Sequence, residues 1–342
     1  MSSPQLFHLS HRNQNRSYST WDMKTVFLDK VRERGGFTCH HAHFDKAYLI
    51  SNENLLLSQR DMQEKWRLYR DLKKGYTFED LYERISRGVQ TMIEQGVTHC
   101  RSFIDADALV GLLPLQAAIA VREEYKDLIH LEYAVQPLEG VLEPKAQEAF
   151  VEACKLADII GGLPSRDRPN PRKHLDFIMN LANELGKPVD VHIDQENQPG
   201  EHETEMLAQA TIDHGLFGRV RGVHAISLAA QPLEEQYRVC ELLKKADVGI
   251  VICPSAAISM KPHNVMAPIH NSIAPLRPLM DAGVDLSLGV DNIADLFMPL
   301  VDGDLWFESR LLMEATRCYD LDIIADIVTA RWGFTDSLDS LS

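Results

Sequence analysis

The stretch Gly35-Gly36-Phe37-Thr38-Cys39-His40-His41-Ala42-His43-Phe44-Asp45-Lys46 places two histidines, two residues apart, at the end of a short apolar segment. Side chains alternate between the two faces of a strand, so His41 and His43 point the same way and can hold one metal ion together. The pattern is weak by itself, because 14 histidines in 342 residues give some His-x-His pairs by chance. Its meaning depends on the chain that follows.

The rest of the chain alternates between strand and helix patterns. With the strand that leads to His41, the predicted strands number eight, and the others cover 97–105, 129–136, 158–163, 188–194, 220–224, 248–253 and 285–291. Helical patterns separate them, which indicates a parallel sheet with helices outside, and eight units are what a closed barrel requires. We therefore predict a (β/α)8 TIM barrel over residues 36–342, after an N-terminal extension, 1–35, with one helix. An open doubly wound sheet is the alternative.

Polar residues at the carboxyl ends of different predicted strands favour the barrel. They are His43, Asp105, Gln136, His192, His224 and Asp291. TIM barrels build their active sites on this face, whereas an open sheet would gather such residues only at a switch point. A lone buried histidine is more simply explained by a structural hydrogen bond, and a lone aspartate by a loop cap. Several of them converging by chance is much harder to explain.

A set of imidazoles with one carboxylate suits a divalent metal that keeps one position open for water. Three imidazoles and a carboxylate are good ligands for Zn²⁺ and acceptable ones for Fe²⁺. Such a metal lowers the pKa of its water towards about 7. A neighbouring carboxylate can then take the proton and return it to a leaving group.

Composition and charge restrict the partners. Lys plus Arg number 35 and Asp plus Glu 50, which gives a net charge of −15. This charge disfavours nucleic acid or an anionic membrane as a partner and favours a small neutral or cationic substrate. The six cysteines are scattered, and no apolar run of about 18 residues occurs, so we expect free thiols, no membrane segment and a cytoplasmic protein. We also expect a homo-oligomer.

Taken together, these stretches resemble the amidohydrolase superfamily, and within it the branch of bacterial cytosine deaminases and N-isopropylammelide aminohydrolase. The resemblance is carried in order by His41-Ala-His43-Phe-Asp45-Lys46, Gly96–Asp105, Val189–Asp194, Val220–His224 and Gly289-Val-Asp291-Asn-Ile-Ala-Asp295-Leu-Phe297. It implies a metal-dependent hydrolase that replaces an amino or alkylamino group on a pyrimidine or s-triazine ring. Relatives also carry a small β-sandwich, which we expect this chain to lack.

The resemblance implies roles for individual residues. The implied metal ligands are His41, His43, His192 and Asp291. Asp291 would also take a proton from the attacking water, and His224 would polarise the group under attack. The implied contacts to substrate are Gln136, Lys46, Gln195 and Phe297. The predicted fourth strand has no lysine that could be carboxylated to bridge two metals, so we expect one metal per chain, Zn²⁺ or Fe²⁺.

One position departs from the family pattern. Cytosine deaminases have a glutamate three residues after the histidine of strand five, where it shuttles a proton, but this chain has Gln195 there. Glutamine cannot transfer a proton in that way, so we expect Glu196 or Asp194 to do so, with Glu196 favoured. The departure keeps a second function open, hydrolysis of a ring or side-chain amide. A third, a non-catalytic metal-binding relative, is disfavoured by the intact histidines.

Overall fold

The computed structural model describes residues 22–51, 53–60, 62–196, 198–260 and 273–334. The strands in these ranges are β1 Phe37–Cys39, β2 Val97–Asp105, β3 His130–Gln136, β4 Ile160–Gly162, β5 Val189–Ile193, β6 Val220–His224, β7 Val248–Ile252 and β8 Leu286–Leu288. The helices are α1 Met23–Glu33, α2 Met62–Lys73, α3 Phe78–Glu94, α4 Leu113–Tyr125, α5 Pro144–Leu156, α6 Pro171–Leu185, α7 Glu203–His214, α8 Leu233–Ala246, α9 Pro254–Ser259, α10 Leu276–Asp281, α11 Leu305–Thr316 and α12 Leu321–Val328.

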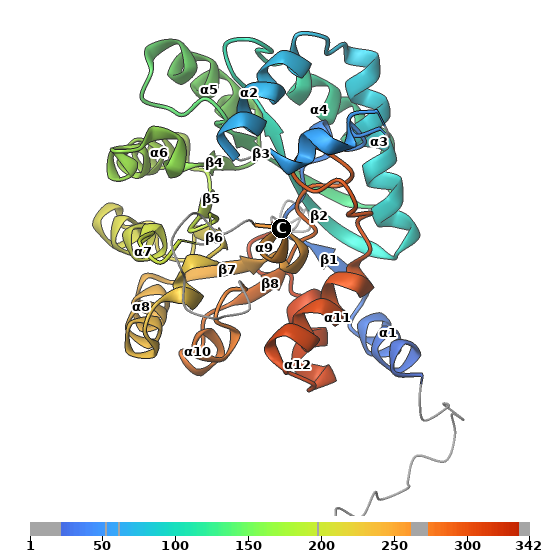
Figure 1. Cartoon of the computed structure of the whole chain (residues 1–342), viewed down its shortest axis with the longest axis vertical. Coiled ribbons are helices and arrows are strands. Elements are labelled where there is room, and N and C mark those ends of the chain that lie inside the picture. Colours follow the sequence, from blue (N-terminus) through green and yellow to red (C-terminus); the bar gives the residue numbers. More distant parts are fainter. Residues whose placement is uncertain (1–21, 52, 61, 197, 261–272, 335–342) are drawn as a thin grey trace, which may run out of the picture.

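The eight strands form one closed ring. All paired strands are parallel, in two sheets with the orders β1-β2-β3 and β4-β5-β6-β7-β8. The sheets meet along both seams: Ala134 on β3 bridges Ile159 before β4, and Ala42 after β1 bridges Asp291 after β8. The predicted (β/α)8 barrel is thereby confirmed (Figure 1).

Both seams depend on a glycine where two backbones approach closely. A Cβ on Gly161 of β4 would lie 1.8 Å from the carbonyl oxygen of Val135 on β3. A Cβ on Gly289, just after β8, would lie 2.6 Å from the Cβ of His41. Only glycine allows these approaches, so the two residues make closure of the ring possible.

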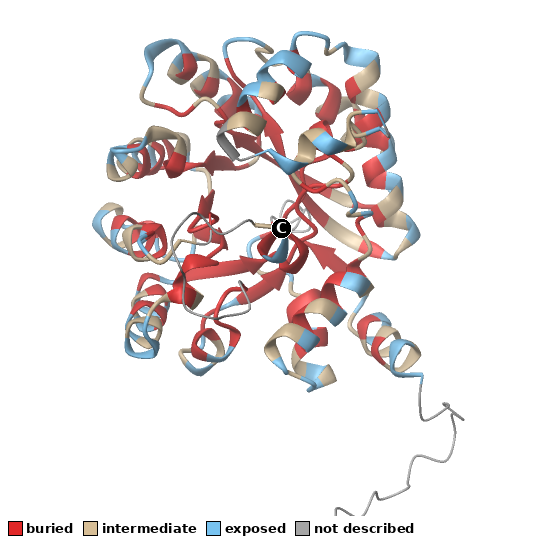
Figure 2. Cartoon of the chain, viewed as in Figure 1, coloured by how far each residue is buried: buried red, intermediate tan, exposed pale blue. Residues whose placement is uncertain are grey.

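The strands lie in the core and the helices cover them, as Figure 2 shows by its buried strands and half-exposed helices. Sequence signals explain several helix boundaries. Thr77 caps α3 by accepting a hydrogen bond from the Asp80 backbone N–H at 3.2 Å, as the Thr-x-x-Asp pattern predicts. Gly186 and Gly215 end α6 and α7 in the left-handed conformation.

Residues 330–334, which we call the C-terminal seal, close the barrel at the amino ends of its strands. The Gly333 carbonyl oxygen accepts hydrogen bonds from Arg101 at 2.7 Å and from Arg221 at 2.6 Å. Both arginines lie inside the barrel and pair with Asp190, at 3.0 and 2.6 Å. The Phe334 ring lies 4.8 Å from the Arg101 guanidinium. A segment that follows every strand in sequence therefore completes the interior ion network.

Some elements differ from the prediction. The chain passes directly from β7 into the short helix α9, where Pro254 occupies the first turn. Strand β8 is shorter than the predicted strand 285–291 and ends before Asp291. The N-terminal extension, 1–35, is described only from residue 22, where it forms α1. No helix among the described residues is long and apolar enough to cross a membrane.

Candidate active site

Four predicted ligands converge at the carboxyl ends of the strands. The Asp291 Oδ1 atom lies 3.3 Å from His41 Nε2 and 3.2 Å from His43 Nε2. His192 Nε2 lies 3.3 Å from His43 Nε2, and the His41 and His192 ring centres are 4.8 Å apart. All four side chains are buried. Residues from β5 and from the segments after β1 and β8 thus meet at one point inside the barrel mouth.

Closure of the barrel assembles this group. The backbone N–H groups of Val290 and Asp291 donate to the His41 carbonyl oxygen, at 3.0 and 3.1 Å. The segment that carries the carboxylate is therefore fastened to the segment that carries two of the imidazoles. Asp291 and His224 both adopt positive φ angles, 62° and 83°. Such backbone strain costs about 1–3 kcal/mol per residue and clusters at functional sites.

The charge states of these groups fit a cation. Burial lowers the pKa of His43 to about 3, and that of His192 well below its usual range. These imidazoles are neutral near pH 7 and offer lone pairs. Burial raises the pKa of Asp291, but the adjacent His41 and His43 rings outweigh it, so this carboxylate is ionised. Neither ring nitrogen of His41 has a hydrogen-bond partner among the described residues. An anionic oxygen among unsatisfied imidazoles is the donor set that a divalent metal requires.

His224, the last residue of β6, lies beside this group. Its Nε2 atom is 4.0 Å from Asp291 Oδ2, and its ring centre is 5.4 Å from that of His192. Burial lowers its pKa to about 4, so it too is neutral near pH 7. His41, His192 and His224 together form a second set of atoms close enough to share a metal. The structure therefore brings the four predicted metal ligands and the predicted catalytic residue His224 together.

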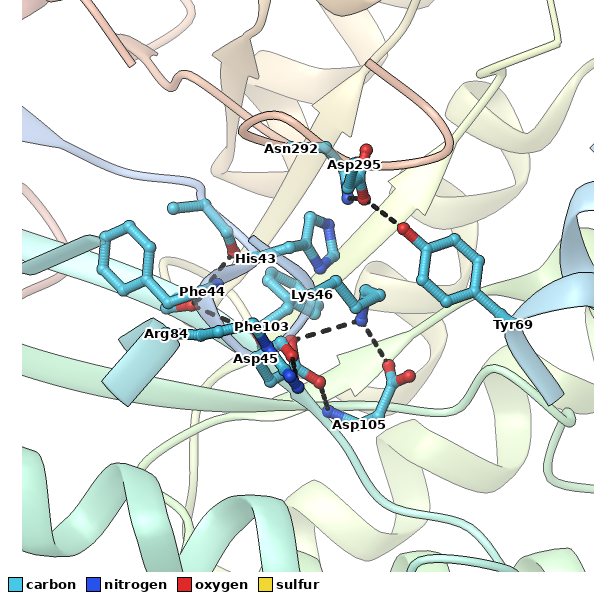
Figure 3. Close-up of polar contacts among 12 residues, drawn as sticks. His43, Phe44, Asp45, Lys46, Tyr69, Arg84, Phe103, Asp105, Asn292 and Asp295 are labelled. Carbon is cyan, nitrogen blue, oxygen red and sulfur yellow. Dashed lines mark hydrogen bonds and ion pairs between the residues drawn. The ribbon is translucent and has the colours of Figure 1, made fainter. Parts of the chain in front are cut away.

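The residues predicted to contact the substrate differ in how far other side chains already occupy their polar atoms. Gln136 is buried at the end of β3, and its Oε1 atom has no hydrogen-bond partner among the described residues. Lys46 is engaged: its Nζ atom lies 2.5 Å from Asp105 and 3.4 Å from Asp45 (Figure 3). The Phe297 ring stacks on Tyr69 with centres 4.9 Å apart. Gln136 therefore keeps free hydrogen-bonding capacity, whereas Lys46 is committed to an ion pair.

The two candidate proton shuttles have partners away from the histidines. Asp194 accepts hydrogen bonds from the backbone N–H of Glu203 at 2.7 Å and from the Thr204 hydroxyl at 2.5 Å, so it holds the start of α7. Glu196 accepts from Arg168 at 2.8 Å and is buried. Between them, the Gln195 amide donates to Ser165 Oγ at 3.2 Å.

Several residues that shape the site have no role in the sequence prediction, although Asp105 and Asp295 stand in the stretches that carry it. Asp105 binds the buried amino groups of Lys46 and Lys73, the latter at 2.7 Å. Tyr69 donates to Asp295, which also accepts from Asn292 at 2.6 Å (Figure 3). The strand-end position of Asp105, and of Asp295 within the stretch after Asp291, was a visible signal. Nothing in the sequence indicated that helix α2 would supply their partners Lys73 and Tyr69.

The geometry agrees with comparisons to known proteins. The amidohydrolase family matches residues 35–327. The chain belongs to the amidohydrolase family. An uncharacterised protein of Haemophilus influenzae is 36% identical over 256 residues, 74% of this chain and 93% of that protein. N-isopropylammelide isopropyl amidohydrolase of a Pseudomonas species is 26% identical over 307 residues, 86% of this chain and 72% of that enzyme.

A solved structure is similar in the same way. The crystal structure of 5-methylcytosine deaminase from Klebsiella pneumoniae with 5-fluorocytosine superposes with a TM-score of 0.78 at 25% identity, over 85% of this chain and 72% of that one. The predicted resemblance is confirmed. The amidohydrolase is therefore a metal-dependent hydrolase that acts on carbon–nitrogen bonds.

Proposed function

We propose that this amidohydrolase is a mononuclear aminohydrolase that replaces an amino or alkylamino group on a nitrogen heterocycle of the pyrimidine or s-triazine type. The observation that carries the proposal is the convergence of three buried imidazoles and one ionised carboxylate, with His224 beside them. Gln136, at the end of β3, adds a buried amide oxygen with no hydrogen-bond partner among the described residues. Similarity to a 5-methylcytosine deaminase and to an N-isopropylammelide hydrolase supports this substrate class.

Each residue of the group has a distinct task in this proposal. His41, His43, His192 and Asp291 would hold one divalent metal, Zn²⁺ or Fe²⁺. When bound, such a metal supplies a Lewis acid that makes water nucleophilic near neutral pH. The Asp291 carboxylate accepts the proton of the attacking water. The neutral His224 imidazole polarises the ring atom under attack, and the Gln136 amide orients the ring.

The leaving amine needs a proton. We assign its delivery to Glu196, because the α7 backbone and Thr204 already occupy both oxygens of Asp194. Gln195, bonded to Ser165, would contact the substrate without proton transfer. The expected result is ammonia or alkylamine release from at least one member of a panel of cytosine, pterin, aminotriazines and N-alkylammelides by zinc- or iron-loaded protein.

A second candidate is hydrolysis of a cyclic amide, and Gln195 is the observation that favours it. An amide bond that opens within a ring leaves its amine attached to the product, so no free ammonia appears. Hydantoin and dihydropyrimidine rings test this reaction by loss of ring absorbance without ammonia release. If metal-loaded protein turns over neither panel, the chain is a binding relative and both proposals fail.

A further inference from the structure

A cavity of about 190 Å³ opens on the same face of the barrel as the histidines. Trp66 and Lys73 of α2 form one wall. Asp107, Leu138 and Arg166, from the segments after β2, β3 and β4, form the others. These three segments follow the carboxyl ends of their strands, so the cavity lies at the mouth of the barrel.

The cavity is cationic although the protein carries a net charge of −15. Four basic side chains line it against two acidic ones. Lys73 is neutralised by Asp107 at 2.6 Å and by Asp105, and Arg70 pairs with Glu139 at 3.2 Å. Arg67 and Arg166 have no carboxylate partner within 4 Å among the described residues. The lining by itself therefore has two more positive than negative side chains, and the charges of Glu139 and Asp167 offset Arg166 only from beyond ion-pair distance.

Arg166 is held in a conformation suited to a planar anion. Its guanidinium stacks over the Trp66 ring at 4.3 Å, and its buried Nε atom lacks a hydrogen-bond partner among the described residues. Burial lowers the pKa of Arg166, because Glu139 and Asp167 offset only part of the loss of hydration of its charge. A stacked guanidinium keeps its edge free, and that edge matches a carboxylate with two parallel hydrogen bonds.

The cavity adjoins the position assigned to the substrate ring. Leu138 in its wall is two residues beyond Gln136, and its N–H donates to the Gln136 carbonyl oxygen at 3.0 Å. Trp66 and Leu138 also belong to an apolar cluster against which Phe297 packs. A substituent on a ring held between Gln136 and Phe297 can therefore extend along one continuous wall of the cavity as far as Arg166.

We propose that this cavity binds a carboxylate carried by the heterocyclic substrate, so that the natural substrate is an anionic heterocycle. The inference rests on the proposed function and revises the preference for a neutral or cationic substrate that net charge alone gave. Arg166 forms the paired hydrogen bonds and Arg67 adds a second charge at the rim. Both are specificity-determining residues, and neither takes part in the bond cleavage.

The test compares each heterocycle with its carboxylated form: cytosine with 5-carboxycytosine, and pterin with pterin-6-carboxylate. For wild type we expect a higher kcat/KM with the carboxylated member of at least one pair. Arg166→Gln should lower the ratio of the two kcat/KM values by roughly 10- to 100-fold, the scale of a lost hydrogen bond to a charged group. Arg166→Lys keeps the charge, so its kcat/KM ratio should lie between those of wild type and Arg166→Gln. This variant replaces Arg166→Gln in the test if the glutamine variant fails to fold.

Arg310→Gln is the matched control, because Arg310 also stacks on an aromatic ring, that of Phe307, but on the outer helix α11. It should leave the ratio unchanged. An unchanged ratio in both Arg166 variants overturns the inference while the proposed function stands. If no heterocycle is turned over, the proposed function fails, and calorimetric titration with pterin-6-carboxylate then tests the cavity separately. Weaker binding to Arg166→Gln than to wild type supports the carboxylate site. Equal binding to both proteins overturns it.

Discussion

Replacing Asp194 and Glu196 one at a time separates structural support from proton transfer. Asp194 accepts three hydrogen bonds at the start of α7, from Glu203 N–H at 2.7 Å, Thr204 N–H at 3.2 Å and Thr204 Oγ1 at 2.5 Å. Asp194→Asn turns one accepting oxygen into a donor that faces N–H groups. The asparagine keeps one accepting oxygen, so the cost is that of one buried unsatisfied donor with its lost hydrogen bond, about 1–3 kcal/mol. We therefore expect Asp194→Asn to lower stability by roughly 1–3 kcal/mol.

Glu196→Gln should have the opposite profile. The side chain keeps its size and one oxygen for Arg168, so stability should change less than in Asp194→Asn. If Glu196 delivers the proton, turnover should fall about 100- to 10,000-fold while the metal stays bound. If Asp194→Asn still folds, its turnover should stay within about tenfold of wild type, because Asp194 does not transfer the proton in this proposal.

The assay is kcat on the heterocycle panel, together with urea unfolding and elemental analysis of each variant. Asp304→Ala is the matched control for a lost helix cap, because Asp304 accepts from Trp306 N–H at 2.8 Å and Phe307 N–H at 3.2 Å at the start of α11, and alanine has no oxygen to accept them. It should cost stability without affecting kcat at temperatures where it is folded. A large kcat loss in Asp194→Asn with full activity in Glu196→Gln would refute the assignment. If neither variant is slow, the proton passes through Asp291 or Lys46.

Four further outcomes are expected. Purified protein should hold about one Zn or Fe per chain, and His192→Ala should lose both metal and activity; two metals per chain by elemental analysis would contradict the mononuclear site. His224→Asn should keep most of the metal and lower kcat roughly 100-fold, whereas equal loss of metal would make His224 a ligand. Gln195→Glu, which restores the family pattern, should raise cytosine deamination, and no rise on any ring would count against a deaminase pocket. Burial raises the pKa of Glu203 from 4.5 to about 8, so the folded protein binds this proton more tightly than the unfolded chain, and wild-type stability should fall as pH rises through this window. Glu203→Gln does not titrate, so its free energy of unfolding should rise relative to that of wild type by up to about 1.4 kcal/mol per pH unit. Urea unfolding between pH 5 and 8 measures this difference.

The sequence was informative where one segment decides its own structure. Strand β2 was predicted with its observed bounds, Val97–Asp105, because Gly96 ends one helical pattern before it and another helical pattern follows it. The histidine and aspartate positions could also be placed, because parallel strands bring their carboxyl ends to one face. Helix α9 escaped prediction, because six residues are too few to show a helical period.

The partners of the site residues could not be predicted, because they come from distant parts of the chain. Lys46, predicted to contact the substrate, pairs with Asp105, which lies 59 residues away in the sequence. Asp194 was a candidate acid, and the structure shows that it holds the start of α7. A charged side chain near a strand end has several ways to be satisfied, and only the packing of neighbouring helices selects one.

The C-terminal seal sets an order of events during synthesis. Every strand of the barrel emerges from the ribosome before residues 330–334, so Arg101 and Arg221 must wait for the Gly333 carbonyl oxygen that both of them bind. Domains fold as units once their residues are available, so the nascent barrel lacks this shared hydrogen-bond acceptor until residues 330–334 have left the ribosome. Before that point the ring of strands would have an open base, where the charges of Arg101 and Arg221 are not yet covered.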